Sequence, residues 1–263
     1  MFAENLRKRL SELAERHAKT HHLLFETSSG GVIIFKKDHN KNIHGNFLDS
    51  SYDNILRKEN WRIRLDKPHP SFRGTKQEVR ELDSCNSSDA LLMNIFCHPK
   101  IDEWKSLRKL LDLSEIGEPE FGFLAKVKKN SGQDDTTEID MKLDGVLVEA
   151  KLTEKDFTRK EKRIVESYDN FKKVFNEELL PQSSEDYLNY QVIRNILAAY
   201  ERNLSFLLLC DARRPDLVKE FYVTARCVRD DWLRVRCNIV FWQEITQSVG
   251  KELRDFLVEK YGF

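Results

Sequence analysis

Three charged residues near the middle of the chain have types that could bind a divalent cation. Asp140 lies four residues before an Asp-Gly pair, and Glu149 and Lys151 follow that pair in the segment VEAK. Mg²⁺ is a hard cation that takes one or two carboxylates together with waters and substrate phosphate oxygens. The ammonium of Lys151 can offset part of the negative charge of the two acids. These residues therefore indicate a divalent-cation site as a candidate chemistry.

A tight hairpin is predicted to position these side chains. Asp144-Gly145 is a signal for a two-residue type I′ turn, with strand-forming residues in alternation on both sides. In that register Leu143 lies opposite Val146, and Asp140 lies opposite Glu149. The apolar face then contains Ile139, Met141, Leu143, Val146, Val148, Ala150 and Leu152. The charged face contains Glu138, Asp140, Lys142, Leu147, Glu149 and Lys151.

The charged face of this hairpin has two interpretations. Carboxylates about 5 Å apart repel by roughly 3 kcal/mol at an effective dielectric of about 20, so a cation bound by Asp140 and Glu149 would relieve the repulsion. Alternatively the face is solvated, with a cross-strand pair between Glu138 and Lys151 and with the other two acids pointing to water. The alternation by itself favours the solvated face.

The segment EIDMKLDGVLVEAKLTE resembles the signature of the PD-(D/E)xK nucleases, the restriction-endonuclease-like superfamily. In that signature an acid on one strand is followed on the next by an acid, any residue and a lysine, here Asp140 and Glu149-Ala150-Lys151. Ile139 stands where the superfamily usually has proline. The segments EPEF, VEAKLTEKDF and YQVIRNIL are similar to a bacterial group of restriction-endonuclease-like proteins over residues 88–210, and residues 1–85 lie outside the resemblance.

The resemblance implies a Mg²⁺-dependent endonuclease acting on DNA, with Mn²⁺ as a substitute ion. Asp140, Glu149 and the backbone carbonyl of Ala150 would hold the metal, and Lys151 would orient or deprotonate the attacking water. The products would carry a 5′-phosphate and a 3′-hydroxyl. Glu120 matches an additional upstream acid of the family, and Gln191 matches a glutamine near its active site. The alternative for Glu120 is a solvated strand end. The alternative for Gln191 is an exposed helix face that also carries Arg194.

Two other functions compete with the nuclease. One is a catalytically inactive module of the same fold that binds nucleic acid or a protein partner. The other is an interaction protein whose hairpin face is only a ladder of salt bridges. The sequence leaves open whether RNA takes the place of DNA and whether two copies of the chain pair as a homodimer.

The order of elements predicts an α/β fold with a restriction-endonuclease-like αβββαβ core, in which helices flank a mixed central sheet. Helices are expected at residues 3–16, from Ser87 or Ser88 to 96, at 101–113, from a Thr153 cap through 164–175, and at 181–201, 215–228 and 250–263. Strands are expected at residues 32–35, 120–129, on both arms of the hairpin, at 204–212 and at 234–242. Residues 37–90 are expected to be irregular. The predicted division is an N-terminal helical and irregular region, 1–86, and a nuclease-like domain, 87–263.

Composition limits the other classes of function. The 263 residues include 44 Lys plus Arg and 44 Asp plus Glu, so net charge does not indicate a polyanionic partner. The charged N-terminal segment and the absence of an apolar run of about 18 residues predict a cytoplasmic protein without a membrane partner. Five widely spaced cysteines without a CxxC pair fit a reducing compartment.

Three further charged segments have residue types that could bind a metal or phosphate. His17 and His21 are four residues apart and could bind a metal from one helix face. Neither this pair nor the neighbouring His22 is accompanied by the Glu of an HExxH motif. They are therefore expected to be solvated. The segments TRKEKR, 158–163, and DARRPD, 211–216, could contact phosphates, although their interleaved acids favour solvated runs.

Overall fold

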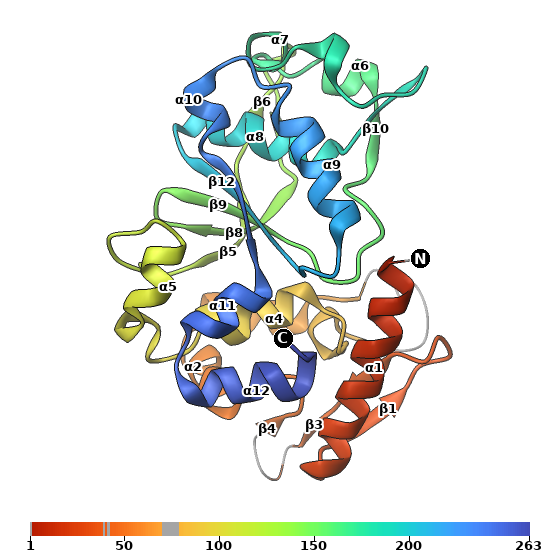
Figure 1. The fold of residues 1–263 in the computed structure, drawn as a ribbon, viewed down its shortest axis with the longest axis vertical. Helices are drawn as coiled ribbons and strands as arrows, with labels where there is room; N and C mark the ends of the chain where they lie inside the picture. Colours follow the sequence, from red (N-terminus) through yellow and green to blue (C-terminus); the bar gives the residue numbers. More distant parts are fainter. Residues whose placement is uncertain (1, 39, 41–42, 70–78) are drawn as a thin grey trace. The chain divides into compact units, whose positions relative to one another are not determined.

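The computed structural model describes residues 2–38, 40, 43–69 and 79–263. It contains two compact units (Figure 1). Unit 1 comprises Met1–Ile116 and Trp242–Phe263, and unit 2 comprises Gly117–Phe241. The predicted boundary between residues 86 and 87 lies inside unit 1. No helix in the described part of the chain combines the length and the apolar character needed to cross a bilayer.

Unit 2 is built on a five-stranded mixed sheet with the strand order β13-β12-β9-β8-β5. The strands are β5 (Glu120–Leu124), β8 (Glu138–Leu143), β9 (Val146–Ala150), β12 (Ser205–Cys210) and β13 (Cys237–Phe241). β9, β12 and β13 are parallel, whereas β8 is antiparallel to both β9 and β5. Every residue of β12 after Ser205 is buried, as its continuous apolar sequence predicted. The α/β class with a mixed sheet and flanking helices is therefore confirmed.

Helix α8 (Tyr190–Arg202) packs on the part of the sheet formed by β9 and β12, and α9 (Pro215–Ala225) packs against α8 (Figure 1). The core between them includes Ile193, Ile196 and Leu197 of α8 together with Leu147 and Phe206 of the sheet. Burial of one helix stripe on an apolar strand face is the main stabilising contribution to such a layer. This packing fixes the polar N-terminal turn of α8 relative to β9.

The segment between β9 and α8 differs from the sequence prediction. It contains short elements, namely β10 (Arg159–Glu161), α6 (Lys162–Val165), α7 (Phe171–Val174), η5 (Glu177–Leu179) and β11 (Asp186–Leu188). The predicted helix through 164–175 and the predicted helix start near 181 are therefore wrong. β10 pairs with β11, so the backbone of this segment is satisfied by strand pairing rather than by a long helix. The remaining short elements of unit 2 are β6 (Val127–Lys128), β7 (Asp134–Asp135) and α10 (Asp231–Arg234).

Unit 1 is mainly helical. Its helices are α1 (Phe2–Thr20), α2 (Asp49–Arg57), α3 (Glu59–Arg62), α4 (Ser88–Phe96), α5 (Lys105–Leu110), α11 (Trp242–Ser248) and α12 (Lys251–Tyr261), with η1 (Ile63–Asp66), η3 (Glu81–Asp83) and η4 (Ile101–Glu103). Its short strands are β1 (Phe25–Thr27), β2 (Ile33–Phe35), β3 (Lys37–Asp38) and β4 (Ile43–His44). Ser87 caps α4 as predicted, since its hydroxyl accepts a hydrogen bond from the Ala90 amide at 3.1 Å.

The expectation of an irregular region at residues 37–90 is wrong for its described part. Helices α2 and α3 occupy residues 49–62, where Tyr52, Ile55 and Trp61 are buried. These apolar residues are sparse among Asn, Ser and Asp, so the sequence shows only a weak helical stripe. Residues 70–78 of this predicted region lie outside the described residues.

Candidate active site

Three strand ends meet at one edge of the unit 2 sheet. β9 and β12 are parallel, so their C-terminal ends lie at the same edge, and the antiparallel strand β8 begins there. This edge carries Glu138 and Asp140 from β8, Glu149 and Lys151 from the end of β9, and Asp211 directly after β12. The topology therefore gathers charged residues that are up to 73 positions apart in sequence.

The hairpin keeps the predicted register only next to its turn. Leu143 faces Val146, Lys142 faces Leu147 and Met141 faces Val148. Beyond this point the β8–β9 ladder ends, and the Asp140 carboxylate accepts a hydrogen bond from the Ala150 amide at 2.8 Å. The expectation of Asp140 and Glu149 as a regular cross-strand pair is therefore wrong. The amide of Ala150 in β9 therefore donates to a side chain of β8 and not to its backbone. This side-chain hydrogen bond lets the two strands part.

The turn itself also differs from the predicted type I′. Asp144 has a φ of 46°, but Gly145 does not adopt a left-handed φ, which type I′ requires at both central positions. The Asp144 carboxylate accepts a hydrogen bond from the Gly117 amide at 2.9 Å. Aspartate tolerates the left-handed region better than most residues, so Asp144 can supply the reversal by itself.

Glu149 lies at the centre of the site and is only 1% exposed. Its Oε1 accepts hydrogen bonds from Lys151 Nζ at 2.8 Å and from Gln191 Nε2 at 2.9 Å. Its Oε2 accepts one from Asn195 Nδ2 at 2.7 Å. A buried carboxylate needs such charge-assisted partners to offset the loss of its hydration. The alternative of a solvated charged face is therefore wrong, because Lys151 is paired with Glu149 in the interior.

The surroundings of Lys151 favour its ammonium form. Burial by itself would lower the pKa of Lys151, but the carboxylates of Glu149, Glu154 and Asp140 outweigh burial and raise this pKa above its usual range. The side chain is 6% exposed. As an ammonium it can donate hydrogen bonds and hold negative charge, and it does not accept a proton from water in this state.

Helix α8 supplies the polar support for Glu149. The structure brings Gln191 to Glu149, and it brings Asn195, one turn further along the same helix face, to the other carboxylate oxygen. Arg194 is buried and donates to the backbone carbonyl of Glu138 and to the Asn195 side-chain oxygen, both at 2.8 Å. The exposed helix face is therefore wrong for this turn of α8. Asn195 escaped sequence analysis, although its spacing of four residues from Gln191 was an available signal.

Replacing Asn195 with leucine is expected to lower the free energy of unfolding by about 1.5–3 kcal/mol, because Glu149 Oε2 then lacks a donor in a buried position. The matched variant Gln191→Leu should cost less, because Gln191 is partly exposed and Oε1 keeps its contact with Lys151. Chemical denaturation of both variants measures the difference. Equal costs, or no cost for Asn195→Leu, would contradict the assigned support of Glu149.

Glu120 is not part of this cluster of contacts. It lies on β5 opposite Lys142 of β8, and the two side chains form an ion pair. The Glu120 side chain is 54% exposed. Glu120 therefore lies on the same sheet as Asp140 and has Lys142 as its partner. Its assignment as an additional upstream acid stays a prediction.

The loop after Lys151 is held by a fully buried arginine. Arg214 donates to the backbone carbonyls of Leu152, Glu154 and Lys155 at 3.3, 2.7 and 3.2 Å, and it pairs with Asp216 at 2.8 Å. No helix begins at Thr153. The expectation of a solvated DARRPD segment is wrong at Arg214, which fixes the loop next to the site.

The residues at this edge fit a divalent cation by their chemistry and their charge. Asp140 and Glu149 offer carboxylate oxygens and Ala150 offers a carbonyl oxygen, the hard ligands that Mg²⁺ prefers. Two carboxylates against one ammonium leave a net negative charge, which attracts a cation. Since Glu149 Oε1 already has two donors, an ion bound there would replace Lys151 or Gln191 on that oxygen.

An open hollow of about 640 Å³ lies on unit 2, and the chain neighbours of Glu138 and Gln191 line part of it. Its lining includes the cations Lys129, Lys160 and Arg163, the carboxylate Asp135, and several neutral polar residues, Ser131, Gln133, Thr137, Ser167 and Tyr190, with Ile164. Two of these, Thr137 and Tyr190, directly precede Glu138 and Gln191 in the chain. The lining of the hollow therefore includes two chain neighbours of the site. It carries more positive than negative side chains.

Asp135 is the one acid in the lining of this hollow. Burial opposes its ionisation, but hydrogen bonds from Thr137 and Tyr168 outweigh burial and lower the pKa of Asp135 to about 2. Asp135 Oδ2 lies 3.5 Å from Lys129 Nζ. Lys160 lies 5.7 Å from the centre of the Tyr190 ring and has no carboxylate partner among the described residues. The hollow therefore keeps cations that can contact an anionic ligand.

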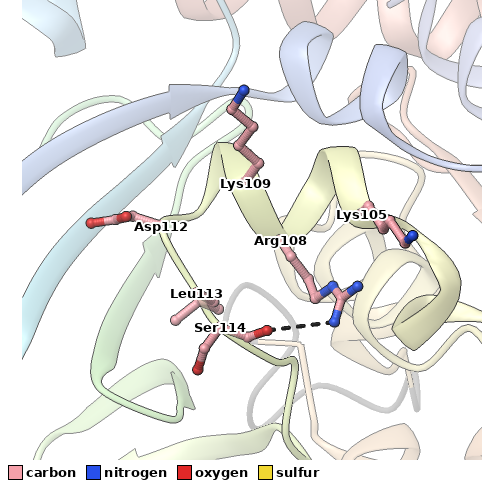
Figure 2. Close-up of a pocket in the computed structure, with 6 residues that line it drawn as sticks. All are labelled: Lys105, Arg108, Lys109, Asp112, Leu113 and Ser114. Carbon is pink, nitrogen blue, oxygen red and sulfur yellow. Dashed lines mark hydrogen bonds between the residues drawn. The ribbon is translucent and has the colours of Figure 1, made fainter.

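A second hollow, of about 520 Å³, lies on α5 in unit 1 (Figure 2). Three cations line it, but Lys109 points away from Arg108, and Arg108 Nη1 donates to the Ser114 carbonyl at 3.4 Å (Figure 2). Its lining contains one acid, Asp112. The cations do not converge on one point, so this hollow is a weaker candidate than the sheet edge of unit 2.

Comparison with family models decides the relationship of the chain. The model described as "Restriction Endonuclease associating with ARP" matches residues 19–262. The chain belongs to this family. The match includes most of both units, and therefore also residues 19–85, which lay outside the sequence resemblance. Searches of the curated proteins and of the solved structures gave no match.

Proposed function

We propose that this chain is a Mg²⁺-dependent endonuclease and that the sheet edge of unit 2 is its active site. The observation that carries the proposal is the buried contact of Lys151 with Glu149 beside Asp140, at the point where β8 and β9 part. Buried charges are costly to fold around, so they are retained mainly where they perform a function. The family description, which names a restriction endonuclease, supports the same reading.

The order of elements supports a restriction-endonuclease-like core. Along the chain α5 is followed by β5, β8 and β9, then by α8 and β12, which is the αβββαβ order expected from the resemblance. β6 and β7 interrupt this order between β5 and β8 as a small separate hairpin, and the short elements β10, α6, α7, η5 and β11 interrupt it between β9 and α8. In this proposal the hairpin is an insertion that forms part of the hollow beside the site.

Asp140, Glu149 and the backbone carbonyl of Ala150 are the proposed ligands of the ion. Bound Mg²⁺, or Mn²⁺ in its place, would polarise the scissile phosphate and lower the pKa of a water molecule. The Asp140 carboxylate already lies next to Ala150, held by the hydrogen bond from its amide. The protein therefore fixes both residues relative to each other before any ligand binds.

Lys151 is proposed to act as a cation in the reaction. As an ammonium in contact with Glu149, it would donate to a phosphate oxygen or to the attacking water and would offset the charge that develops on phosphorus-bound oxygens. Gln191 and Asn195 are positioning residues, because both contact Glu149. Their amides would hold this carboxylate in place when Lys151 turns toward the substrate.

The hollow beside the site supports a nucleic-acid substrate. Lys129, Lys160 and Arg163 can contact the backbone phosphates on one side of the cleaved bond. Such contacts carry no base specificity, so they fit both DNA and RNA. We propose DNA as the substrate, in agreement with the family description. Pairing of two copies stays a prediction, and the description adds an association with ARP to the proposal.

The second candidate is an inactive nuclease-fold module that binds nucleic acid or a protein partner. One observation favours it: both oxygens of Glu149 accept hydrogen bonds from side chains of the protein itself, so this carboxylate has partners without an ion. A binding module needs only this stable edge and the neighbouring cations.

One assay separates the two candidates. Purified protein is incubated with supercoiled plasmid, linear duplex, single-stranded DNA and RNA, in Mg²⁺, Mn²⁺ or EDTA, and mobility shifts are recorded in parallel. The nuclease predicts cleavage with Mg²⁺ or Mn²⁺ and intact substrate in EDTA. Mobility shifts without cleavage in either metal would instead support the binding module.

A further inference from the structure

Two histidines and a glutamate converge in unit 1. His17 lies in the last turn of α1, His21 lies in the turn directly after that helix, and Glu259 comes from α12, which packs beside α1 (Figure 1). Glu259 Oε1 lies 3.1 Å from His17 Nδ1 and 2.8 Å from His21 Nε2. Glu259, which is 238 residues after His21, thus supplies the acid that is missing next to the two histidines in the sequence.

The spacing of the three atoms is close to that of a zinc site. Bonds of 2.0–2.2 Å at tetrahedral angles place neighbouring ligand atoms about 3.3–3.5 Å apart. The three atoms lie within 4.8 Å of one another, and both nitrogens already face the same carboxylate oxygen. Small rotations of the two exposed side chains, His21 and Glu259, would bring all three onto one ion.

The environment of His17 holds its ring in a fixed orientation. His17 is 6% exposed, and the edge of Phe256 packs against it with ring centres 5.6 Å apart. A fixed buried ligand with two exposed partners gives both preorganisation and access from solvent.

We propose that His17, His21 and Glu259 form a zinc site that links α1 to α12, with water in the remaining coordination position. Two imidazole nitrogens and one carboxylate are a donor set that Zn²⁺ takes, whereas Mg²⁺ prefers oxygen ligands alone. The site is therefore distinct from the candidate active site in ligands and in metal. The bound ion would join segments that are distant in sequence, the end of α1 and α12.

Metal-dependent thermal unfolding tests this site without reference to activity. Full-length protein treated with EDTA and dialysed should show a Tm about 5–10 °C higher when Zn²⁺ is added at 100 times its Kd. The variants His21→Gln and Glu259→Gln should fold, because both residues are exposed, and should lose this response. His22→Gln, next to the site at the end of α1, is the matched control and should respond like wild type.

Co²⁺ gives a second readout that reports coordination directly. Wild-type protein and the Asp140→Asn variant should both develop the visible d–d absorption of bound Co²⁺, and His21→Gln should not. Retention of the Zn²⁺-dependent Tm shift and of the Co²⁺ spectrum in both His21→Gln and Glu259→Gln would overturn the proposal. Absence of either response in the wild type would overturn it as well.

Discussion

Methionine in place of Lys151 is expected to reduce Mg²⁺-dependent cleavage by at least about 100-fold, because the site loses the ammonium that contacts Glu149. Methionine has a similar length and removes the charge and the donors. Binding of Mg²⁺ should be kept or become tighter, because the ammonium no longer competes for Glu149 Oε1. Single-turnover cleavage of labelled duplex and metal titration of the same preparation measure the two effects.

Lys142→Met is the matched control for this variant. Lys142 lies on the same strand pair, but its partner is the exposed Glu120 at the neighbouring strand. Its replacement should change the cleavage rate by less than a few fold, because an exposed ion pair contributes little. Equal loss of activity in Lys142→Met and Lys151→Met would show that the charge of the face matters and that the specific position of Lys151 does not.

Arg214→Met is expected to destabilise the protein by about 3–5 kcal/mol, because Asp216 and three backbone carbonyls lose a buried cation. The loop that follows Lys151 would lose its attachment to the start of α9, so cleavage should fall in parallel. Urea denaturation followed by circular dichroism gives the change in free energy of unfolding.

Arg234→Met controls for the loss of a guanidinium as such. Arg234 also pairs with a nearby aspartate, Asp231, but its side chain is 40% exposed and that of Asp231 is 83% exposed. A cost below about 1 kcal/mol is expected at this position. If Arg214→Met cost no more than this, the loop would not depend on the buried arginine and its proposed role would be wrong.

The central strands of the unit 2 sheet, β8, β9 and β12, were predictable from their sequences. β12 is a continuous apolar run, and the hairpin of β8 and β9 alternates around an Asp-Gly pair, so both position and class followed. The segment after Lys151 was not predictable in the same way. Tyr168, Phe171 and Phe175 have helical spacing, yet they enter the core from the short helix α7 and its flanking residues, because tertiary contacts override a local stripe.

The candidate site was partly predictable for a similar reason. Asp140, Glu149 and Lys151 are close in sequence, so a hairpin register was sufficient to bring them together. The register did not show that the strands part at Asp140 or that Glu149 is buried, because both depend on packing of α8. Asn195, Arg214 and Glu259 come from distant helices or loops, and their contacts with the two sites arise only from the tertiary fold.

Calorimetric titration of Mg²⁺ tests most directly whether this edge is a metal-dependent site. Wild-type protein should bind the ion, and the isosteric variants Asp140→Asn and Glu149→Gln should each lose most of the binding heat while keeping the far-ultraviolet circular dichroism of the wild type. His21→Gln should bind Mg²⁺ as the wild type does. If Asp140→Asn and Glu149→Gln bound Mg²⁺ with unchanged affinity, the assignment of the active site to this edge would be contradicted.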